Sequence, residues 1–470
     1  MRPPFTRLSP RMANDAHTQQ LQRDLGMWSA VAIVVGTVIG SGIFLVPKTM
    51  ILAVGSTPMV FFVWIFAGAL TLAGALTYAE LASAMPEAGG EYVYLREAYG
   101  PFWAYIYGWT QMWVAKSGSI ATLATAFGLY LANFYPKLEE VLWTLPLPLG
   151  KDGGPLEIRP GQLLGMGLIA VLAGINYFGV RFGGRVQVGV TMVKVACILA
   201  MIVAGLSTPL ANAANLSSSM PARAGFVGFF AATVAALWAY EGWNNVAMVS
   251  SEIKNPRRTL PLALIAGSAT VMAIYLLANV AYFLVLSAQE VGTSDRVAAA
   301  MMRKLAGQPG AATVSVAAMI SIFAALNGSI LTGARVPYAM ARDGLFFRKV
   351  ANVHPRYATP TTSLLAIGAW SAVLVLSGRY EQLFTYVIFA SWILYGMTGA
   401  AVLVLRRTRP EMERPYRTFG YPVVPVLFVV GAMVLVASTL KASPRESVMG
   451  VGVIAVGVPF YYYWRRKRLE

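Results

Sequence analysis

Repeated apolar runs of about 20 residues constrain this chain most, because a run of that length crosses the hydrocarbon core of a membrane as a helix. Hydrophobic residues make up 57% of the 470 positions and charged residues only 12%, roughly half of the charged share of about 25% in soluble domains. Strands of a membrane β-barrel would alternate in segments of about 10 residues, whereas these runs are continuously apolar. The sequence therefore predicts an all-α polytopic membrane protein with one integrated bundle.

Twelve transmembrane helices are expected from these runs. They cover about 28–53, 57–84, 101–134, 161–178, 186–208, 225–250, 260–286, 311–340, 360–377, 382–405, 421–440 and 446–464. With a cytoplasmic tail at 1–24, the basic clusters at 254–258, 406–409 and 465–468 all fall on the cytoplasmic side, as the positive-inside rule requires. The net charge of +17 then reports orientation, with a secondary attraction to anionic lipids. It does not indicate nucleic acid as a partner.

The residues that carry catalytic or metal chemistry are scarce in this sequence. Cys197 is the single cysteine and lies in an apolar run where we expect it to be buried, and the two histidines, His17 and His354, lie in polar flanks. Zinc spacings, a P-loop and a secretory cleavage pattern are absent from the sequence. We therefore expect no cofactor and no enzyme activity.

The first apolar run contains an unusual stretch, Val35–Phe44, which reads VGTVIGSGIF. Glycine is unfavourable inside a helix, and a helix that breaks within a membrane exposes backbone groups that must face protein, water or a ligand. The alternative interpretation is close helix packing through Gly36 and Gly40, spaced as GxxxG. The stretch alone does not decide between a packing face and a ligand loop.

A second interruption, Glu241-Gly242-Trp243-Asn244-Asn245, lies within the sixth apolar run. A carboxylate at this depth normally faces the bundle interior or an aqueous cavity. Two interrupted helices in corresponding positions of two halves indicate an inverted-repeat transporter with its site at the midplane. Because the breaks are five helices apart, the second five must run in the opposite sense. We expect repeats at 25–208 and 225–405, two further spans within 421–464, and a basic cytoplasmic tail at 465–470.

The broken helices also predict the ligand. The N-terminal end of a half-helix presents amide groups that attract a carboxylate, and carbonyl groups at the C-terminal ends attract an ammonium. We assign the carboxylate to the amides of Gly40, Ser41 and Gly42. The ammonium is assigned to the carbonyls of Val38, Trp238, Ala239 and Glu241. One site with both features fits an α-amino acid.

These residues belong to a wider pattern. The chain resembles the amino acid–polyamine–organocation superfamily, and within it the L-type amino-acid transporters with their bacterial homologues. The matching blocks are GTVIGSGIFLVP at 36–47, YAELASAMPEAGGEYVYL at 78–95, AYEGWNNVAMVSSEIKNPRRTLPLA at 239–263, NGSILTGARVPYAMARDGL at 327–345 and RPYRTFGYP at 414–422. The resemblance covers about 22–420. It implies a leucine-transporter-type fold whose first ten of twelve helices form a 5+5 inverted repeat with broken helices 1 and 6.

The resemblance also implies roles for single residues. Trp238 corresponds to a bulky aromatic residue that closes over the substrate, and Tyr275 to a tyrosine associated with the site in bacterial relatives. Glu241 replaces a glycine of several animal relatives, which puts the side-chain specificity in doubt. Lys194 corresponds to a lysine that takes the place of sodium and braces the first helix; snorkelling to the interface is its alternative.

Other polar residues within the spans are interpreted as structural or gate residues. We expect Lys116 to brace the interior, Glu80 and Arg335 to form inner-gate or scaffold pairs, and Asn327 to hydrogen-bond between helices. Lys48 is expected to snorkel outward. The segment 85–100 is interpreted as an amphipathic helix on the membrane surface, the loop 136–160 as exposed, and the loop 287–310 as helical around 295–305.

The function predicted from these observations is sodium-independent exchange of neutral L-amino acids by alternating access. The alternatives are proton-coupled transport or exchange of cationic amino acids or polyamines, since Glu241 can pair a second positive charge, and an amino-acid sensor without flux. Because the loop 133–160 has no cysteine, no disulfide-linked heavy subunit is expected as a partner. A bacterial inner membrane is the expected location, with membrane lipids around the bundle.

Overall fold

The structure of this chain is a computed structural model that describes residues 21–147, 154–221, 225–377, 380–442 and 444–469. Most of the predicted cytoplasmic tail 1–24 lies outside the described residues. The helices are α2 (Met27–Val38), α3 (Gly42–Val54), α4 (Thr57–Ala84), α5 (Glu91–Tyr99), α6 (Pro101–Thr110), α7 (Lys116–Leu131), α8 (Pro160–Tyr177), α9 (Val180–Ser207), α10 (Phe226–Ala239), α11 (Asn245–Met248), α12 (Pro256–Val285), α13 (Ala288–Thr293), α14 (Val297–Gly333), α15 (Arg335–Arg342), α16 (Thr361–Ser377), α17 (Tyr380–Thr408), α18 (Val423–Ala442) and α19 (Pro444–Leu469).

Eight helical segments in the described part of the chain are long and apolar enough to cross a membrane. The first of them, Met27–Val54, joins α2 and α3 across the break, and α10 and α16 are shorter apolar helices. Many large apolar side chains on α9 and α18 face outward, as in Val203 and Met433, which are 62% and 59% exposed. These faces suit contact with lipid, so the chain is a multi-pass helical membrane protein.

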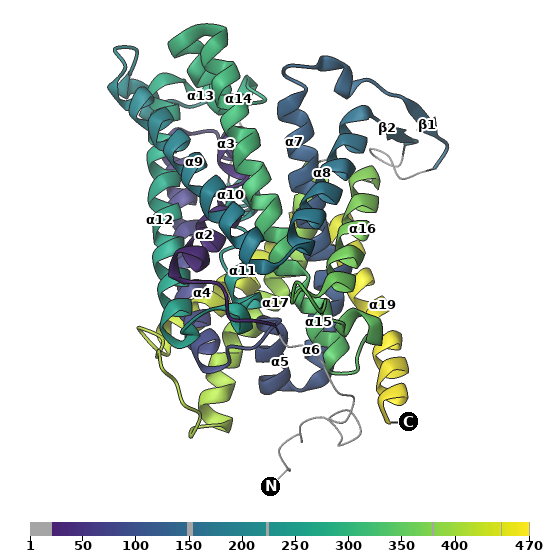
Figure 1. Cartoon of the computed structure of the whole chain (residues 1–470). Helices are drawn as coiled ribbons and strands as arrows, with labels where there is room; N and C mark the ends of the chain where they lie inside the picture. The colour runs from purple at the N-terminus through teal and green to yellow at the C-terminus, as the bar shows by residue number, and fades with distance from the viewer. Residues whose placement is uncertain (1–20, 148–153, 222–224, 378–379, 443, 470) are drawn as a thin grey trace.

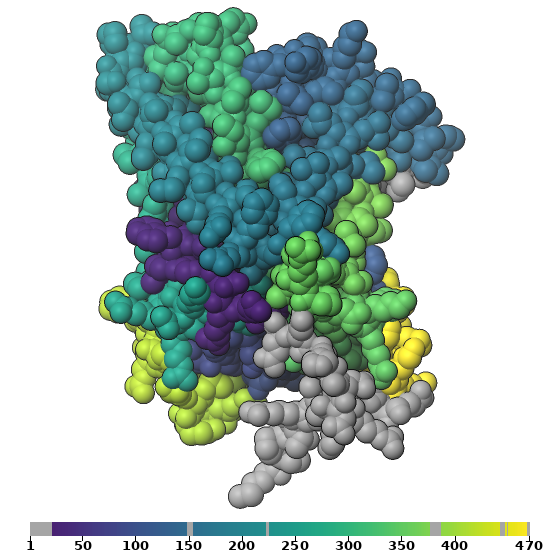
Figure 2. Space-filling model, viewed as in Figure 1, coloured from purple at the N-terminus to yellow at the C-terminus, as the bar shows by residue number. Residues whose placement is uncertain are grey.

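The two halves of the chain are interleaved rather than separate. α12 packs against α4, α14 packs against α9 and α7, and α10 packs against α3. Figure 1 shows α2, α3, α10 and α11 near the middle of the bundle, and Figure 2 shows the surface of one continuous body. The interrupted helices are therefore enclosed by long, continuous ones.

Both predicted breaks are present. Helix α2 ends at Val38, Ile39 leaves the helical region with φ −72° and ψ 88°, and α3 begins at Gly42. In the sixth apolar run, α10 ends at Ala239 and α11 begins only at Asn245. Gly242 in between has φ +104°, a backbone conformation that favours glycine.

Two predicted spans are less regular than the sequence indicated. The span expected at 101–134 contains a π-helical segment, η1 (Gln111–Ala115), between α6 and α7. The span expected at 311–340 begins in α14, which is kinked at Ala306 and Gly307, and ends in a separate helix, α15. Such local irregularities leave no clear signal in apolar periodicity.

The interpretation of 85–100 as a surface helix is wrong. Residues Glu91–Leu95 of α5 are buried in the bundle. The apolar tyrosine and leucine side chains could face either lipid or protein, and only the tertiary contacts with α6 and α17 decide.

The two long loops at 136–160 and 287–310 also carry structure that the sequence did not reveal. Strands β1 (Trp143–Leu145) and β2 (Leu156–Ile158) form an antiparallel pair within the exposed loop. In the second loop, α13 precedes α14, so the helix expected around 295–305 is the first part of α14. Figure 1 shows β1, β2 and α13 at one end of the bundle and α5, α6 and α15 at the other.

Candidate functional site

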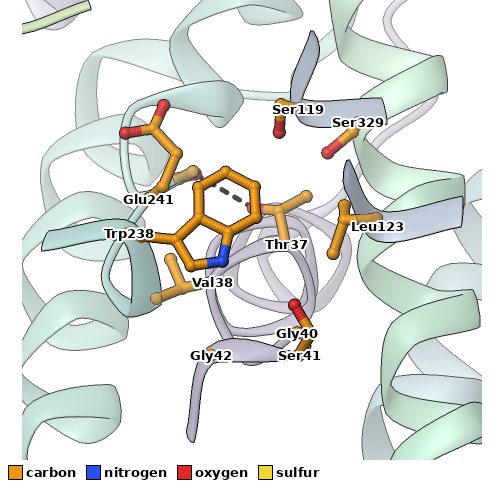
Figure 3. A pocket seen from close by; sticks show the side chains of 11 residues that line it. Thr37, Val38, Gly40, Ser41, Gly42, Ser119, Leu123, Trp238, Glu241 and Ser329 are labelled. Atoms are coloured by element: carbon orange, nitrogen blue, oxygen red, sulfur yellow. Dashed lines mark hydrogen bonds between the residues drawn. The ribbon is translucent and has the colours of Figure 1, made fainter. Parts of the chain in front are cut away.

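A small cavity lies between the two helix breaks. It is lined by Thr37, Val38, Gly40, Ser41, Gly42, Ser119, Leu123, Trp238, Glu241, Gly242 and Ser329. Figure 3 shows the Trp238 indole across the middle of the site, with Glu241 on one side and Ser119 and Ser329 on the other.

The first break is held from outside by Lys194 of α9. Its Nζ donates to the carbonyl oxygens of Gly36 at 2.6 Å and Ile39 at 2.5 Å, and the side chain is fully buried. Ser321 of α14 donates to the same Ile39 oxygen at 2.9 Å. The carbonyls released by the break therefore have partners, which a membrane interior requires.

The two breaks are joined directly by hydroxyl groups. The Tyr275 hydroxyl of α12 contacts the carbonyl oxygens of Val38 and Ala239, both at 2.8 Å. Thr37 donates from its hydroxyl to the Gly242 carbonyl at 2.9 Å. The last residues of α2 and α10 are thus fixed relative to each other, with their carbonyl ends meeting at one hydroxyl group.

Glycine permits this close approach. A Cβ atom added at Gly42 would lie 2.5 Å from Ala239 Cα, closer than packing allows. At Gly40 it would lie 3.1 Å from Leu123 and 3.3 Å from Ala325, and at Gly36 it would overlap Gln187 and Thr191 of α9. Close helix packing and the open loop therefore occur in the same stretch. Gly36 allows the close packing of α2 against α9.

The amides of Gly40, Ser41 and Gly42 lie at the N-terminal start of α3, whose first amides have no acceptor within the helix. Ser41 is 1% exposed and Trp238 is 5% exposed. The structure thus brings together the eight residues assigned to the ligand: six of them line the cavity, Ala239 lies against Gly42, and the Tyr275 hydroxyl contacts the carbonyls of Val38 and Ala239.

Glu241 points its carboxylate toward the side of the cavity. Its Oε1 accepts from the Tyr395 hydroxyl of α17 at 2.6 Å. Nearby, the buried Lys116 donates to Asn245 Oδ1 at 2.5 Å, so this lysine braces the start of α11. Lys116, which does not line the cavity, also interacts electrostatically with Glu241.

The remaining predicted residues lie away from the cavity and have structural partners. Arg335 makes a buried bidentate pair with Glu252, at 2.7 and 2.8 Å. Glu80 pairs with Arg406 at 2.7 Å and with Arg414 at 3.2 Å. Glu80 and Arg335 therefore have separate partners.

The predicted hydrogen bonding of Asn327 is confirmed, because it bridges Asn176 at 2.8 Å and Gln187 at 2.9 Å. Lys48 does not simply extend to the interface, because it pairs with Asp295 at 2.5 Å. Cys197 is only half-buried, in contrast to the expectation, because it lies on the outer side of α9.

The sequence did not assign five cavity residues to the site: Thr37, Ser119, Leu123, Ser329 and Gly242, the last of which was recognised only as part of the second break. Three of them are hydroxyl residues next to glycines within apolar runs, in Gly36-Thr37, Gly118-Ser119 and Gly328-Ser329. Small polar pairs of this kind were the available signal. Leu123 carries no such signal, because an apolar residue on a span can face lipid, protein or a cavity, and the sequence does not distinguish these positions.

Comparisons with known proteins identify the family of this chain. The model of the amino acid permease family matches residues 25–463. The chain is similar to the serine/threonine exchanger SteT of Bacillus subtilis, at 33% identity over 96% of this chain and 99% of that protein. It is also similar to the human b(0,+)-type amino acid transporter 1, at 32% identity over 96% and 89%, and to the human cystine/glutamate transporter, at 30% over 95% and 87%.

A multi-pass helical bundle with a polar cavity between two interrupted helices defines a membrane transport protein. This chain belongs to the amino acid permease family. The resemblance found in the sequence is therefore confirmed, together with the class of function, amino-acid transport across a membrane by an exchanger-type carrier.

Proposed function

We propose that the protein exchanges neutral L-amino acids without sodium, by alternating access around the cavity between the two breaks. The observation that carries this proposal is the joint enclosure of the cavity by the N-terminal end of α3 and the C-terminal ends of α2 and α10. Amide groups favour the substrate carboxylate and carbonyl groups favour its ammonium. We infer exchange, rather than uptake alone, from the relatives, one of which is named a serine/threonine exchanger.

In this proposal the substrate carboxylate binds the amides of Gly40, Ser41 and Gly42. The ammonium binds the carbonyls of Val38, Trp238, Ala239 and Glu241. The Tyr275 hydroxyl, which has one proton to donate, already contacts two of these oxygens, but each carbonyl has a second lone pair to offer. The Trp238 indole, which crosses the cavity in Figure 3, closes over the bound molecule.

Lys194 replaces a sodium ion in this account. Its ammonium binds two carbonyl oxygens at the first break. A bound sodium ion would make the same contacts with these oxygens. Flux should then be equal with sodium or potassium in the buffer.

The architecture proposed for this cycle has twelve spans, with inverted repeats at 25–208 and 225–405 and two further spans within 421–464. Breaks in α2–α3 and α10–α11 support it, because they occupy corresponding positions. The basic clusters support cytoplasmic N- and C-termini, including the tail 465–470, in a bacterial inner membrane. Without a cysteine in the external loop at 133–160, the carrier is proposed to work without a disulfide-linked heavy subunit.

A second candidate, transport of cationic amino acids, is favoured by the Glu241 carboxylate at the cavity. Its pairing with Tyr395 and its proximity to Lys116 support the neutral substrate, because the charge is already partly compensated. Proton-coupled uptake and amino-acid sensing without flux gain no specific support from the contacts of the residues that line this cavity. Exchange of a neutral amino acid therefore stays the first candidate.

Competition between amino acids tests the substrate class. Purified protein in liposomes is loaded with unlabelled serine, and uptake of labelled serine is measured with excess alanine, leucine, arginine or putrescine outside. Alanine or leucine should reduce uptake, and arginine should not. Inhibition by arginine alone would reverse the order of the two candidates, and Glu241→Gln should then abolish that inhibition.

A further inference from the structure

The connection between α4 and α5 buries a carboxyl group that the cavity does not use. Glu91 is the first residue of α5 and is 0% exposed, although α5 is not one of the candidate spans. Its Oε1 accepts a hydrogen bond from the side-chain amide of Asn244. Asn244 lies in the second break, just before α11, so a buried acid contacts the interrupted helix from outside the cavity.

This contact leaves two buried oxygens, Glu91 Oε2 and Asn244 Oδ1, without a well-formed hydrogen bond in the described part of the chain. The Tyr107 hydroxyl, which also lacks a well-formed hydrogen bond there, lies close enough to interact with the Glu91 carboxyl. A buried polar atom without a partner is unfavourable. A protonated carboxyl group carries an O–H donor, and an acid and a primary amide can then pair through two hydrogen bonds. One proton on Glu91 therefore satisfies both oxygens.

The surroundings of Glu91 favour that proton. Burial raises the pKa of its carboxyl from 4.5 to about 7, against the opposing effects of the Asn244 amide, the Tyr107 hydroxyl and the Lys116 charge. Lys116 is shared with a second carboxyl group, Glu241. One ammonium therefore faces two acids, and a proton balances the cluster.

The other ionisable groups near Glu91 are tyrosines. They come from α4, from α5 itself, from α6 and from α17, and are Tyr78, Tyr94, Tyr107 and Tyr395. On the α15 side, Asp343 is bound by Arg96 and Tyr92, and Arg335 is bound by Glu252. Lys116 is thus the cation whose charge acts most directly on Glu91.

We propose that Glu91 and Asn244 form a proton-binding site that controls the docking of the α4–α5 connection on the inner half of the sixth span. The backbone supports this coupling. The Gly89 amide donates to the Met248 carbonyl at 2.9 Å, and a Cβ atom at Gly90 would lie 2.9 Å from the Ala247–Met248 peptide. The connection thus lies directly on α11, at the end of the bundle that carries α5 in Figure 1.

The direction of the pH effect follows from proton linkage. In the docked arrangement the Glu91 pKa is about 7, whereas a hydrated carboxyl returns toward 4.5. Between these values the docked arrangement binds more protons than an opened one. Docking is therefore strongest at low pH, weakens as the pH rises toward about 7, and changes no further above that.

Infrared titration tests proton binding without any transport. The detergent-purified protein is titrated from about pH 5 to about pH 9, and the C=O band of a protonated carboxyl group is followed. We expect a band that disappears with a midpoint near 7, is absent in Glu91→Gln, and persists in Glu87→Gln, a control whose carboxyl is 59% exposed on the same connection. If Glu91→Gln does not fold, Glu91→Asp should shift the band. No titrating band in the wild type, or one unchanged in a folded Glu91 variant, overturns the proposal.

Exchange in liposomes tests the coupling, and this part rests on the proposed function. With equal pH on both sides, wild type and Glu87→Gln should change their exchange rate between about pH 5 and pH 8, whereas Glu91→Gln should keep one rate. An amide at position 91 can pair with Asn244 at every pH. An unchanged pH profile in an active Glu91→Gln variant contradicts the coupling. Absence of exchange in the wild type would contradict the transport function and leave the infrared result standing.

Discussion

Lys194 donates from its ammonium to the Ile39 carbonyl at 2.5 Å, at the residue where the first span stops being helical. A second hydrogen bond reaches Gly36 at 2.6 Å. A fully buried lysine from α9 thus holds the carbonyl end of α2, where the break begins. The Lys194 ammonium therefore stabilises the break at the position where the backbone of the span no longer makes helical hydrogen bonds.

Replacing Lys194 tests this brace. Hydrogen bonds to a charged group contribute about 1.5–3 kcal/mol each, so Lys194→Ala should lower exchange about 10-fold or more. Lys304→Ala removes a half-exposed external lysine that pairs with Glu290 and should retain most of the rate. Labelled amino-acid exchange in liposomes is the measurement. A Lys194→Ala protein with wild-type rate and pH dependence would rule out the brace.

The Tyr275 hydroxyl links the carbonyl ends of the two broken helices. Tyr275→Phe removes the hydroxyl, and with it the one hydrogen bond that its proton makes at a time, with little change of shape. At roughly 1 kcal/mol for that bond, we expect substrate binding to weaken by about 5-fold. Tyr282→Phe on the same helix is the control, because its hydroxyl contacts only Met201 Sδ, at 3.9 Å. The half-saturating substrate concentration for exchange should rise in the first variant and stay unchanged in the second.

Gly42 lies against the end of α10, and an added side chain has no space there. With Cβ only 2.5 Å from Ala239 Cα, Gly42→Val should force α3 and α10 apart and abolish exchange while the protein remains in the membrane. Gly167→Ala on α8 meets no atom within 4 Å and should be silent. Membrane fractions quantify insertion, and exchange in liposomes quantifies function. Robust transport by Gly42→Val would return the stretch to a simple packing role.

The ion pair between Arg335 and Glu252 should contribute to stability rather than to substrate binding. Both side chains are at most 2% exposed, and removing one partner of a buried pair costs about 3–5 kcal/mol because the other charge is left alone. Glu252→Gln should therefore lower the thermal unfolding temperature clearly. The double variant Glu252→Gln, Arg335→Met should recover part of the loss. Equal destabilisation by the single and double variants would contradict this reasoning.

The sequence predicted those parts of the site that depend on local chemistry. Glycines and polar residues within apolar runs mark the breaks at Ile39–Ser41 and Tyr240–Asn244, since membrane helices rarely place such residues without a reason. Asn327 was correctly expected to bond between helices. The resemblance pointed to Lys194 and Tyr275, and the structure shows which carbonyls they bind.

The parts that depend on long-range packing were not predictable. The burial of Glu91 requires the neighbouring helices, and the choice of Glu252 as partner for Arg335 bridges residues far apart in the chain. Leu25, just before α2, and Ile253, just after the sixth span, form an isolated β-bridge. This contact also joins residues far apart in the chain and could not be predicted from either segment alone. Apolar periodicity describes one helix at a time and says nothing about which neighbour a side chain meets.

The central claim is tested most directly by trans-stimulated exchange in the presence and absence of sodium. Liposomes with the purified protein are loaded with unlabelled neutral amino acid or left empty, and the uptake of labelled amino acid is followed in sodium or potassium buffer. The account predicts uptake into loaded liposomes only, at the same rate in both buffers. Uptake that requires sodium, or that ignores the internal amino acid, would contradict it.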